Sequence, residues 1–274
     1  MGMDICRPSK NEQIMSEYID THAHLYDEAF DEDRDEVVAK MKKAGVVHCI
    51  MPAIDISVSG AQIRCSEMYR DYTSLALGLH PTSVGERWKE ELDFVYGQMN
   101  GADRGKVCAV GEVGLDEYWS KEFAKEQKLV FMEQIKLAEE LDLPMIIHLR
   151  DATDSLFEVF EKMKGCKMRG VFHAFSGSFE MYERINRYGD FIIGIGGVVT
   201  FKNAQVAKTL ERIPVERIVY ETDSPYLSPV PLRGKRNDSS NLLYISHKVA
   251  EIKMVDEGRI AKTVMETTKN WFNI

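Results

Sequence analysis

The chain has 274 residues, of which 44% are hydrophobic and 29% are charged, and its formal net charge is −9. This composition is typical of a soluble globular protein with a large core, and no apolar run approaches the roughly 20 residues that a membrane helix needs. The acidic balance argues against a broad nucleic-acid-binding face, which usually requires a basic stripe. It still allows a local cationic site around a metal centre.

The N-terminal segment and the cysteines bear on the compartment. The start, MGMDICRPSKNEQIMSEY, lacks the apolar core of a signal peptide, and we predict that residues 1–17 form an extension before the first strand. The five cysteines are scattered without a CxxC pair, as in proteins of a reducing compartment. We therefore expect a cytoplasmic protein with one domain over residues 18–274, no membrane segment and no obligate protein partner.

Apolar runs of strand length alternate with longer amphipathic stretches. The predicted strands cover residues 17–25, 46–54, 74–80, 107–115, 144–149, 170–177, 190–197 and 217–224. The clearest predicted helices cover residues 121–143, 152–164, 201–213, 241–253 and 256–272. Near-continuous apolar strands suit a parallel sheet buried on both faces. Eight such units predict an α/β fold, a single (β/α)8 barrel of the TIM type with its active site at the C-terminal ends of the strands.

Side chains that bind metal ions fall at the ends of several predicted strands. In YIDTHAHL the two histidines stand two residues apart, so a strand would place both imidazoles on one face. The C-terminal ends of the strands meet at one mouth of a barrel, where a cluster of imidazoles and carboxylates would be costly without a cation. The predicted metal ligands are His22, His24, Glu112, His148, His173 and Asp223.

Six ligands are too many for one closed tetrahedral site, so the set suits two divalent ions. Glu112 is the natural bridge, because one carboxylate can offer an oxygen to each ion. Imidazole and carboxylate together suit Zn, Ni or Fe as bound ions, and Mg or Mn are expected to support activity. Two adjacent ions can activate water and stabilise a leaving oxygen, which indicates hydrolysis of a phosphoester. Asp223 could bind metal and also accept a proton from the attacking water, so Glu112 and Asp223 are the predicted catalytic residues.

Seven motifs follow one another from about residue 18 to the C-terminus: DTHAHL, GLHP, GEVGLD, IIHLRDA, FHAFSGS, ETDSPYLSPVPLRGKRN and TTKNWF. Together they resemble the TatD-type metal-dependent deoxyribonucleases of the amidohydrolase superfamily. This resemblance implies a cytoplasmic nuclease that uses divalent metal ions and typically trims single-stranded DNA from the 3′ end. The family's ligand motifs fall on the same six residues that the strand ends select.

The chain departs from the family pattern in loops. It reads RGKRNDSS where the family commonly has RGKRNEP, so Asp238 keeps the charge but Ser239 replaces the proline. Leu232 stands where a histidine is often seen, and Gly196 and Gly197 occupy a motif in which a serine often precedes the glycine. These changes bear on the choice of substrate more than on metal binding.

Five further residues are predicted to bind substrate. His80 ends the third strand, and Arg150 shares a face with His148 and could reach a phosphate, brace a ligand or form a salt bridge with Asp151. The basic cluster RGKR follows the eighth strand, where it could clamp phosphates or form a solvated surface loop. The predicted substrate contacts are His80, Arg150, Arg233, Lys235 and Arg236.

Two other functions remain open at this stage. One is a different hydrolase of the same superfamily that cleaves a small phosphoester, ester or amide. Many such enzymes bridge their metals with a carbamylated lysine at the end of strand four, where this chain has Glu112. The other is a metal-binding protein without catalysis, which would have no use for the basic cluster.

Overall fold

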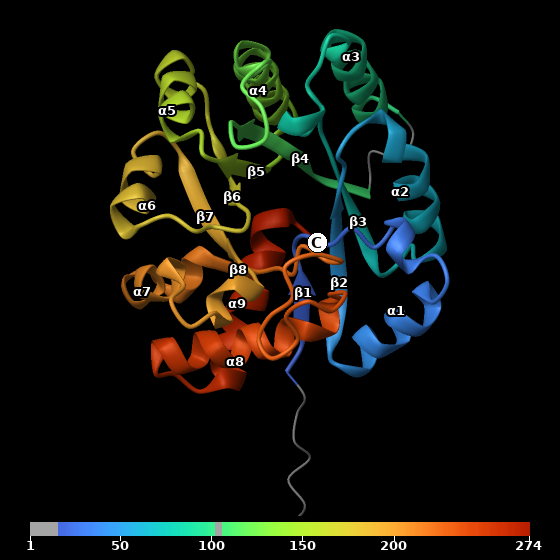
Figure 1. Ribbon diagram of the computed structural model, residues 1–274, viewed down its shortest axis with the longest axis vertical. Helices are drawn as coiled ribbons and strands as arrows, with labels where there is room; N and C mark the ends of the chain where they lie inside the picture. The colour runs from blue at the N-terminus through green and yellow to red at the C-terminus, as the bar shows by residue number, and fades with distance from the viewer. Residues whose placement is uncertain (1–15, 102–105) are drawn as a thin grey trace, which may run out of the picture.

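The computed structural model describes residues 16–101 and 106–274. Eight parallel strands surround a central axis in chain order, and helices cover their outer side (Figure 1). The strands are β1 (Tyr18–Asp20), β2 (Val46–Pro52), β3 (Thr73–Leu77), β4 (Val107–Asp116), β5 (Met145–Arg150), β6 (Arg169–Phe172), β7 (Asp190–Ile195) and β8 (Ile218–Tyr220). The helices are α1 (Arg34–Lys43), α2 (Ile56–Met68), α3 (Trp88–Met99), α4 (Ala124–Leu141), α5 (Thr153–Lys162), α6 (Phe179–Ile185), α7 (Gln205–Arg212), α8 (Leu242–Lys253) and α9 (Glu257–Phe272).

Each strand pairs in parallel with the next, from β1 to β8. The first and last strands are joined by isolated contacts: the Thr21 N–H donates to the Tyr220 carbonyl at 3.0 Å, and the His24 N–H donates to the Ser224 carbonyl at 2.8 Å. The sheet is therefore a nearly closed barrel, and the predicted (β/α)8 TIM-type fold is confirmed.

Apolar side chains fill the barrel interior below the C-terminal ends of the strands. Ile50, Ile146, Val171 and Ile192 come from four different strands and belong to one buried cluster. Phe272, at the end of α9, packs into the same cluster. Because this part of the interior is packed with side chains, polar residues at the C-terminal ends of the strands face the mouth of the barrel at that end.

Six of the eight predicted strands end earlier than expected. β1 ends at Asp20 rather than at residue 25, so His22 and His24 follow the strand instead of lying within it. The structure ends β6 at Phe172 and β8 at Tyr220, although the apolar pattern predicts strands to 177 and 224. Shortly after each strand, Ala174 and Asp223 adopt φ angles of 44° and 56°. The left-handed conformation is uncommon for non-glycine residues and breaks the extended pairing. His173 and Asp223 therefore lie in turns just beyond their strands rather than within them.

The five predicted helices correspond to α4, α5, α7, α8 and α9. Each helix is between one and five residues shorter than predicted. The predicted N-terminal extension lies outside the described residues except for residues 16 and 17, which precede β1. Within the described part of the chain, no helix combines the length and the apolar character needed to cross a bilayer.

Candidate metal centre

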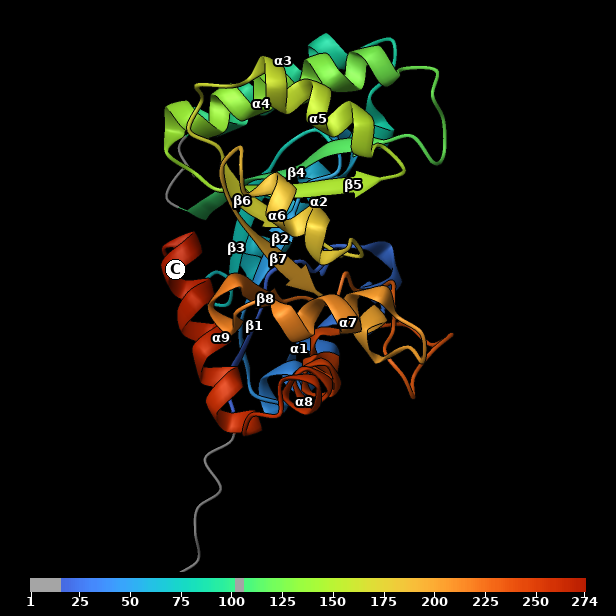
Figure 2. The ribbon, with the colours of Figure 1, turned by 90° about the vertical axis from the view of Figure 1, so that its left-hand side faces the viewer.

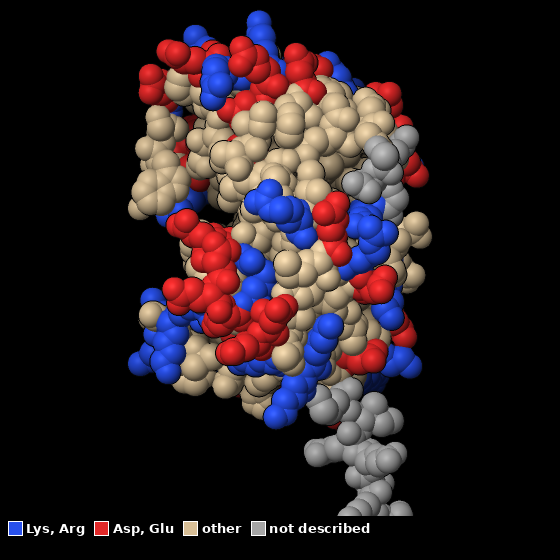
Figure 3. Space-filling model, turned by 90° about the vertical axis from the view of Figure 1, so that its right-hand side faces the viewer, with Lys and Arg blue, Asp and Glu red and all other residues tan. Residues whose placement is uncertain are grey.

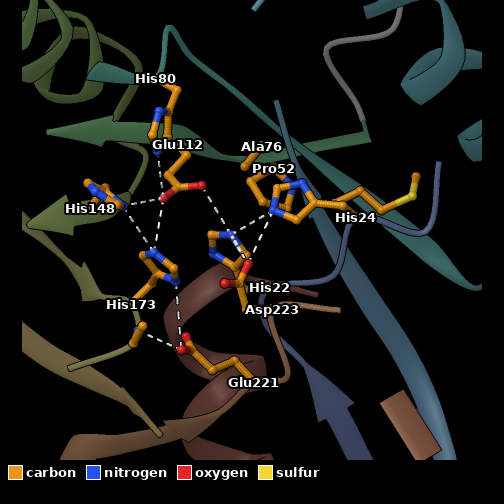
Figure 4. Close-up of polar contacts among 12 residues, drawn as sticks. His22, His24, Pro52, Ala76, His80, Glu112, His148, His173, Glu221 and Asp223 are labelled. Atoms are coloured by element: carbon orange, nitrogen blue, oxygen red, sulfur yellow. Dashed lines mark hydrogen bonds and ion pairs between the residues drawn. The ribbon is translucent and has the colours of Figure 1, made fainter. Parts of the chain in front are cut away.

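The structure brings all six predicted metal ligands together, and His80 joins them (Figure 4). They come from β1, β3, β4, β5, β6 and β8 or from the turns that follow these strands. Each of the three groups that can hold a cation combines imidazole nitrogens with a carboxylate oxygen. The groups are His22 with His24 and Glu112; His22 with His173 and Asp223; and His80 with Glu112 and His148.

Glu112 lies at the centre of this cluster, and its two oxygens face different histidines. Oε2 lies 3.1 Å from His22 Nε2. Oε1 lies 3.0 Å from His148 Nδ1, 3.0 Å from His173 Nε2 and 3.3 Å from His80 Nε2. The carboxylate thus connects two groups of imidazoles, as a bridging ligand would.

The histidine pair of YIDTHAHL converges on a second carboxylate. The Nε2 atoms of His22 and His24 lie 3.2 Å apart, and they lie 3.6 and 3.4 Å from Asp223 Oδ1. His24 is held from its other side, because its Nδ1 lies 2.8 Å from the Tyr26 hydroxyl. Both imidazoles face Asp223, although they lie in the segment after β1 and not in a strand as the HxH spacing predicts.

Charges within the cluster are strongly coupled. Burial raises the pKa of Glu112, but the charges of His173, His80 and His22 outweigh burial and hold it well below its ordinary range. Burial and the charge of His173 lower the pKa of His22 to about 4, so its imidazole is neutral. Burial lowers the pKa of His173, but Glu112 and Glu221 outweigh it and raise the pKa to about 10. The cluster therefore stabilises positive charge beside Glu112.

These residues fit divalent cations. A neutral imidazole offers a lone pair on one of its nitrogens, and the facing Nε2 atoms of His22 and His24 converge with Asp223 Oδ1. The side chains of His22, His24 and Glu112 are at most 4% exposed, so their polar atoms need partners inside the protein. A mixed set of imidazoles and carboxylates is preferred by Zn, Mn, Fe and Ni.

Three buried acids support this cluster, and the sequence analysis did not single them out. Asp116 Oδ2 lies 2.8 Å from His148 Nε2, and Glu221 Oε1 lies 3.7 Å from His173 Nδ1. Asp20 accepts hydrogen bonds from the backbone N–H groups of His22 and Thr222. Carboxylates that contact the second nitrogen of a ligating histidine fix its orientation. Strand alternation could have indicated Asp116, because it lies four residues after Glu112 on the same face.

A cavity of about 730 Å³ opens above the cluster, with Glu112, His148 and Asp223 in its lining. Of the residues predicted to bind substrate, His80 and Arg150 also line it. His80 faces Glu112, as described above. Arg150 forms no ion pair with any described carboxylate, so the alternative of a salt bridge with Asp151 is not seen.

The predicted basic cluster lines a separate groove of about 610 Å³. Arg236 pairs with Asp33, with nitrogen–oxygen distances of 2.9 and 2.5 Å, and Arg233 lies over the Phe201 ring at 4.3 Å. Lys235 is exposed and has no carboxylate partner among the described residues. Tyr226 and Leu227 line both the groove and the metal cavity, so the two adjoin at these side chains.

Acidic side chains flank the mouth on another side. Asp27, Glu28 and Asp31 line a groove beside α2, which also meets the cavity at Tyr226. Figure 3 shows a hollow at the left edge of the face that carries α1 and α2, with acidic side chains gathered below it. Arg34 and Arg64 line this groove as well, and Arg34 pairs with Asp31. A polyanion would therefore be attracted more strongly over the groove of Arg233 and Lys235.

A barrel with histidines and carboxylates converging at the C-terminal ends of its strands has the architecture of a metal-dependent hydrolase. The comparisons identify the family: a family model described as "TatD related DNase" matches residues 19–273, and the chain belongs to this family.

Relatives of this chain support the assignment. It is 36% identical over 256 residues to a protein of Bacillus subtilis described as the uncharacterized metal-dependent hydrolase YabD, covering 93% of this chain and 98% of that one. It is 31% identical over 261 residues to the uncharacterized metal-dependent hydrolase YcfH of Escherichia coli K12, and the match covers 93% of this chain and 96% of YcfH. The crystal structure of YjjV, a TatD homolog from Escherichia coli K12, matches this structure with a TM-score of 0.84 and 27% sequence identity. The match covers 95% of this chain and 100% of YjjV.

Proposed function

We propose that the protein is a deoxyribonuclease that hydrolyses phosphodiester bonds with two divalent ions and trims single-stranded DNA from its 3′ end in the cytoplasm. The observation that carries this proposal is the position of Glu112, whose two oxygens face two different groups of histidines beneath an open cavity. The family description supports a nucleic-acid substrate. The basic groove that adjoins the cavity favours a polyanion over a small neutral ester or amide.

Each side chain of the cluster has a defined task in this reaction. His22, His24, Glu112, His148, His173 and Asp223 would hold the ions, with His80 beside Glu112. Divalent ions held at such a site would lower the pKa of a bound water and stabilise charge on the phosphoryl oxygens. Asp223 lines the cavity, and its pKa is low because contacts with His24 and His22 outweigh the effect of burial. Its carboxylate is thus placed to accept a proton from the attacking water.

The test is a panel of substrates and ions on the full-length protein. We expect Mg or Mn to support hydrolysis of a 5′-labelled single-stranded oligonucleotide and of a small phosphodiester, and a chelator to stop both reactions. The labelled strand should shorten stepwise if digestion starts at the 3′ end. Hydrolysis of a small amide alone would overturn the proposal in favour of another amidohydrolase. No hydrolysis with Mg, Mn or Zn would favour a metal-binding protein without catalysis.

Metal occupancy is the first prediction from this proposal. The protein is expected to bind up to two divalent ions, the weaker of which is lost during purification and returns on titration, because binding depends on deprotonated ligands and on availability. Elemental analysis of the purified protein, followed by calorimetric titration with Mn, measures both sites. Absence of any bound divalent ion at saturating concentrations would contradict it.

The basic groove gives a second prediction. Replacing Arg233 and Lys235 with alanine should raise KM for single-stranded DNA and reduce the slope of log binding constant against log salt by about 0.7 for each lost phosphate contact. Hydrolysis of a small phosphodiester should change little, because it has no neighbouring phosphates. Arg236 is left in place because its ion pair with Asp33 holds the loop.

The matched control removes two lysines from α9, which lies on the side of the barrel away from the mouth (Figure 2). Replacing Lys262 and Lys269 with alanine changes the net charge by the same amount and should leave KM and its salt dependence unchanged. Equal losses on DNA and on the small phosphodiester in the Arg233 and Lys235 variant would instead indicate damage at the metal cluster.

A further inference from the structure

Two aromatic side chains and an arginine lie together at the end of β4 and β5. The Arg150 guanidinium carbon lies 3.7 Å from the centre of the Tyr118 ring and 5.3 Å from that of Trp119. The two rings meet nearly at right angles, with centres 5.0 Å apart. Cation–π attraction and edge-to-face packing therefore hold the three side chains as one unit.

Trp119 and Arg150 also form part of the wall of the metal cavity. The indole lines the cavity together with Arg150, yet it is 69% exposed. Burying so large an apolar ring is favourable, so its exposure beside a cavity leaves a flat surface for a ligand to cover. Tyr118 does not line the cavity, but its ring packs against the Arg150 guanidinium.

The segment that carries Trp119 is fixed to the metal cluster through Asp116. Asp116 Oδ1 accepts hydrogen bonds from the backbone N–H groups of Tyr118 at 3.0 Å and Trp119 at 3.2 Å. Its Oδ2 lies 2.8 Å from His148 Nε2. One buried carboxylate thus orients both a predicted metal ligand and the aromatic segment, and a ligand that contacts both meets a preorganised surface.

The opposite wall of the cavity also carries exposed apolar side chains. Because the strands follow chain order around the barrel, the loops after β4 and β8 stand across the mouth from each other. Figure 2 shows the two loops projecting on the same side of the molecule, toward which the β5 arrow points. Tyr226 and Leu227, which are 52% and 43% exposed, line the cavity from the β8 side.

We propose that Trp119 and Arg150 form a nucleoside subsite next to the metal cluster. A nucleobase stacks on the Trp119 indole, and the Arg150 guanidinium binds the phosphate of the same nucleotide. No described carboxylate pairs with Arg150, so its N–H groups remain available for a phosphate. Base stacking on an aromatic face accepts any base, so this subsite selects nucleotides without selecting sequence. The inference rests on the proposed function and names the part of the substrate that the cavity wall recognises.

A binding measurement tests the subsite without turnover. The probes are thymidine 5′-monophosphate and deoxyribose 5-phosphate, which share a phosphate but differ in the base, added to the Mn-supplied protein. Thymidine monophosphate should quench tryptophan fluorescence and bind more tightly than the sugar phosphate. Trp119→Phe should keep the affinity, because phenylalanine still offers an aromatic face. It should abolish most of the quenching, because the two remaining tryptophans, Trp88 on α3 and Trp271 on α9, do not line the cavity. Trp119→Ala should weaken nucleotide binding at least about fivefold and leave sugar phosphate binding unchanged.

The control is Leu129→Ala, which removes an exposed apolar side chain from α4 outside the cavity and should change neither affinity. The subsite is overturned if the parent binds both probes equally, or if Trp119→Ala weakens both to the same extent. A fall in the affinity of Leu129→Ala equal to that of Trp119→Ala would also overturn it.

An activity measurement separates this inference from the proposed function. The substrates are a single-stranded oligonucleotide and the same strand with an abasic 3′-terminal residue. The parent should favour the base-bearing strand in kcat/KM by about fivefold or more, and Trp119→Ala should remove that preference. Equal hydrolysis of both strands by the parent overturns the subsite and leaves the nuclease proposal intact. Discrimination in binding without hydrolysis of either strand overturns the nuclease proposal and supports the subsite.

Discussion

Replacing Glu112 with alanine or glutamine is expected to lower kcat/KM on single-stranded DNA by about 10³-fold or more, since each ion contributes several kcal/mol of charge stabilisation. The structure gives the reason: Oε1 and Oε2 face different histidines, so one substitution removes a ligand from both proposed ions. Glutamine keeps the shape but offers a neutral amide, which cannot bridge two cations. Both variants should also bind less divalent metal in elemental analysis.

Thermal unfolding with and without Mn provides a readout that does not depend on catalysis. An ion that binds only the folded state raises Tm, so the parent should show a metal-dependent Tm that the Glu112 variants largely lose. Glu158→Gln is the matched control, because it makes the same chemical change at an exposed residue of α5 that pairs with Lys128 of α4. Activity of either Glu112 variant within about threefold of the parent would contradict the bridging role.

The alternation of apolar runs was sufficient to predict the fold. Ile146, Val171 and Ile192 point into the barrel while their neighbours pack under helices, so the strands are apolar on both faces. The pattern could not give the ends of β1, β6 and β8. Ala174 and Asp223 turn the chain through positive φ angles, and neither residue type signals a left-handed turn as glycine would.

The ligand set followed from the rule that parallel strands end on the same side of a barrel. That rule places His148 and His173 near Glu112, but it cannot say which nitrogen or oxygen each residue offers. His80, which was predicted to bind substrate, lines the cavity, and its Nε2 also lies 3.3 Å from Glu112 Oε1 within the cluster of predicted ligands. The buried acid Glu221 was missed, because its role depends on the histidine beside it rather than on a motif.

Contacts between distant segments account for the rest. Arg236 is paired with Asp33, a residue 203 positions away in the chain. One of the three cations of the basic cluster is therefore already paired with a carboxylate, which the sequence could not indicate. In the same way, Tyr118 follows β4 and Arg150 ends β5, and the two side chains stack because β4 and β5 are neighbours in the sheet. Neither pair leaves a local pattern, and only the folded chain reveals them.

Replacing Asp223 with asparagine is expected to lower kcat on single-stranded DNA by at least about 10²-fold while most of the metal and the substrate affinity remain. Asparagine keeps the shape and one coordinating oxygen, but it cannot accept the proton of the attacking water. The position supports this role: Asp223 lines the cavity, with 18% of its side chain exposed, and its Oδ1 lies 3.4 Å from His24 Nε2.

The measurement is kcat together with the metal content of the same sample at saturating Mn. A variant that keeps its metal and a near-normal kcat would remove Asp223 from the chemistry. A variant that loses its metal even at saturation would assign Asp223 to coordination alone. The two roles are separable because five other predicted ligands remain, three of them gathered around Glu112 Oε1 or Oε2 within 3.1 Å. Loss of kcat with metal retained therefore identifies the carboxylate as a proton acceptor, which a protein that only holds metal would not need.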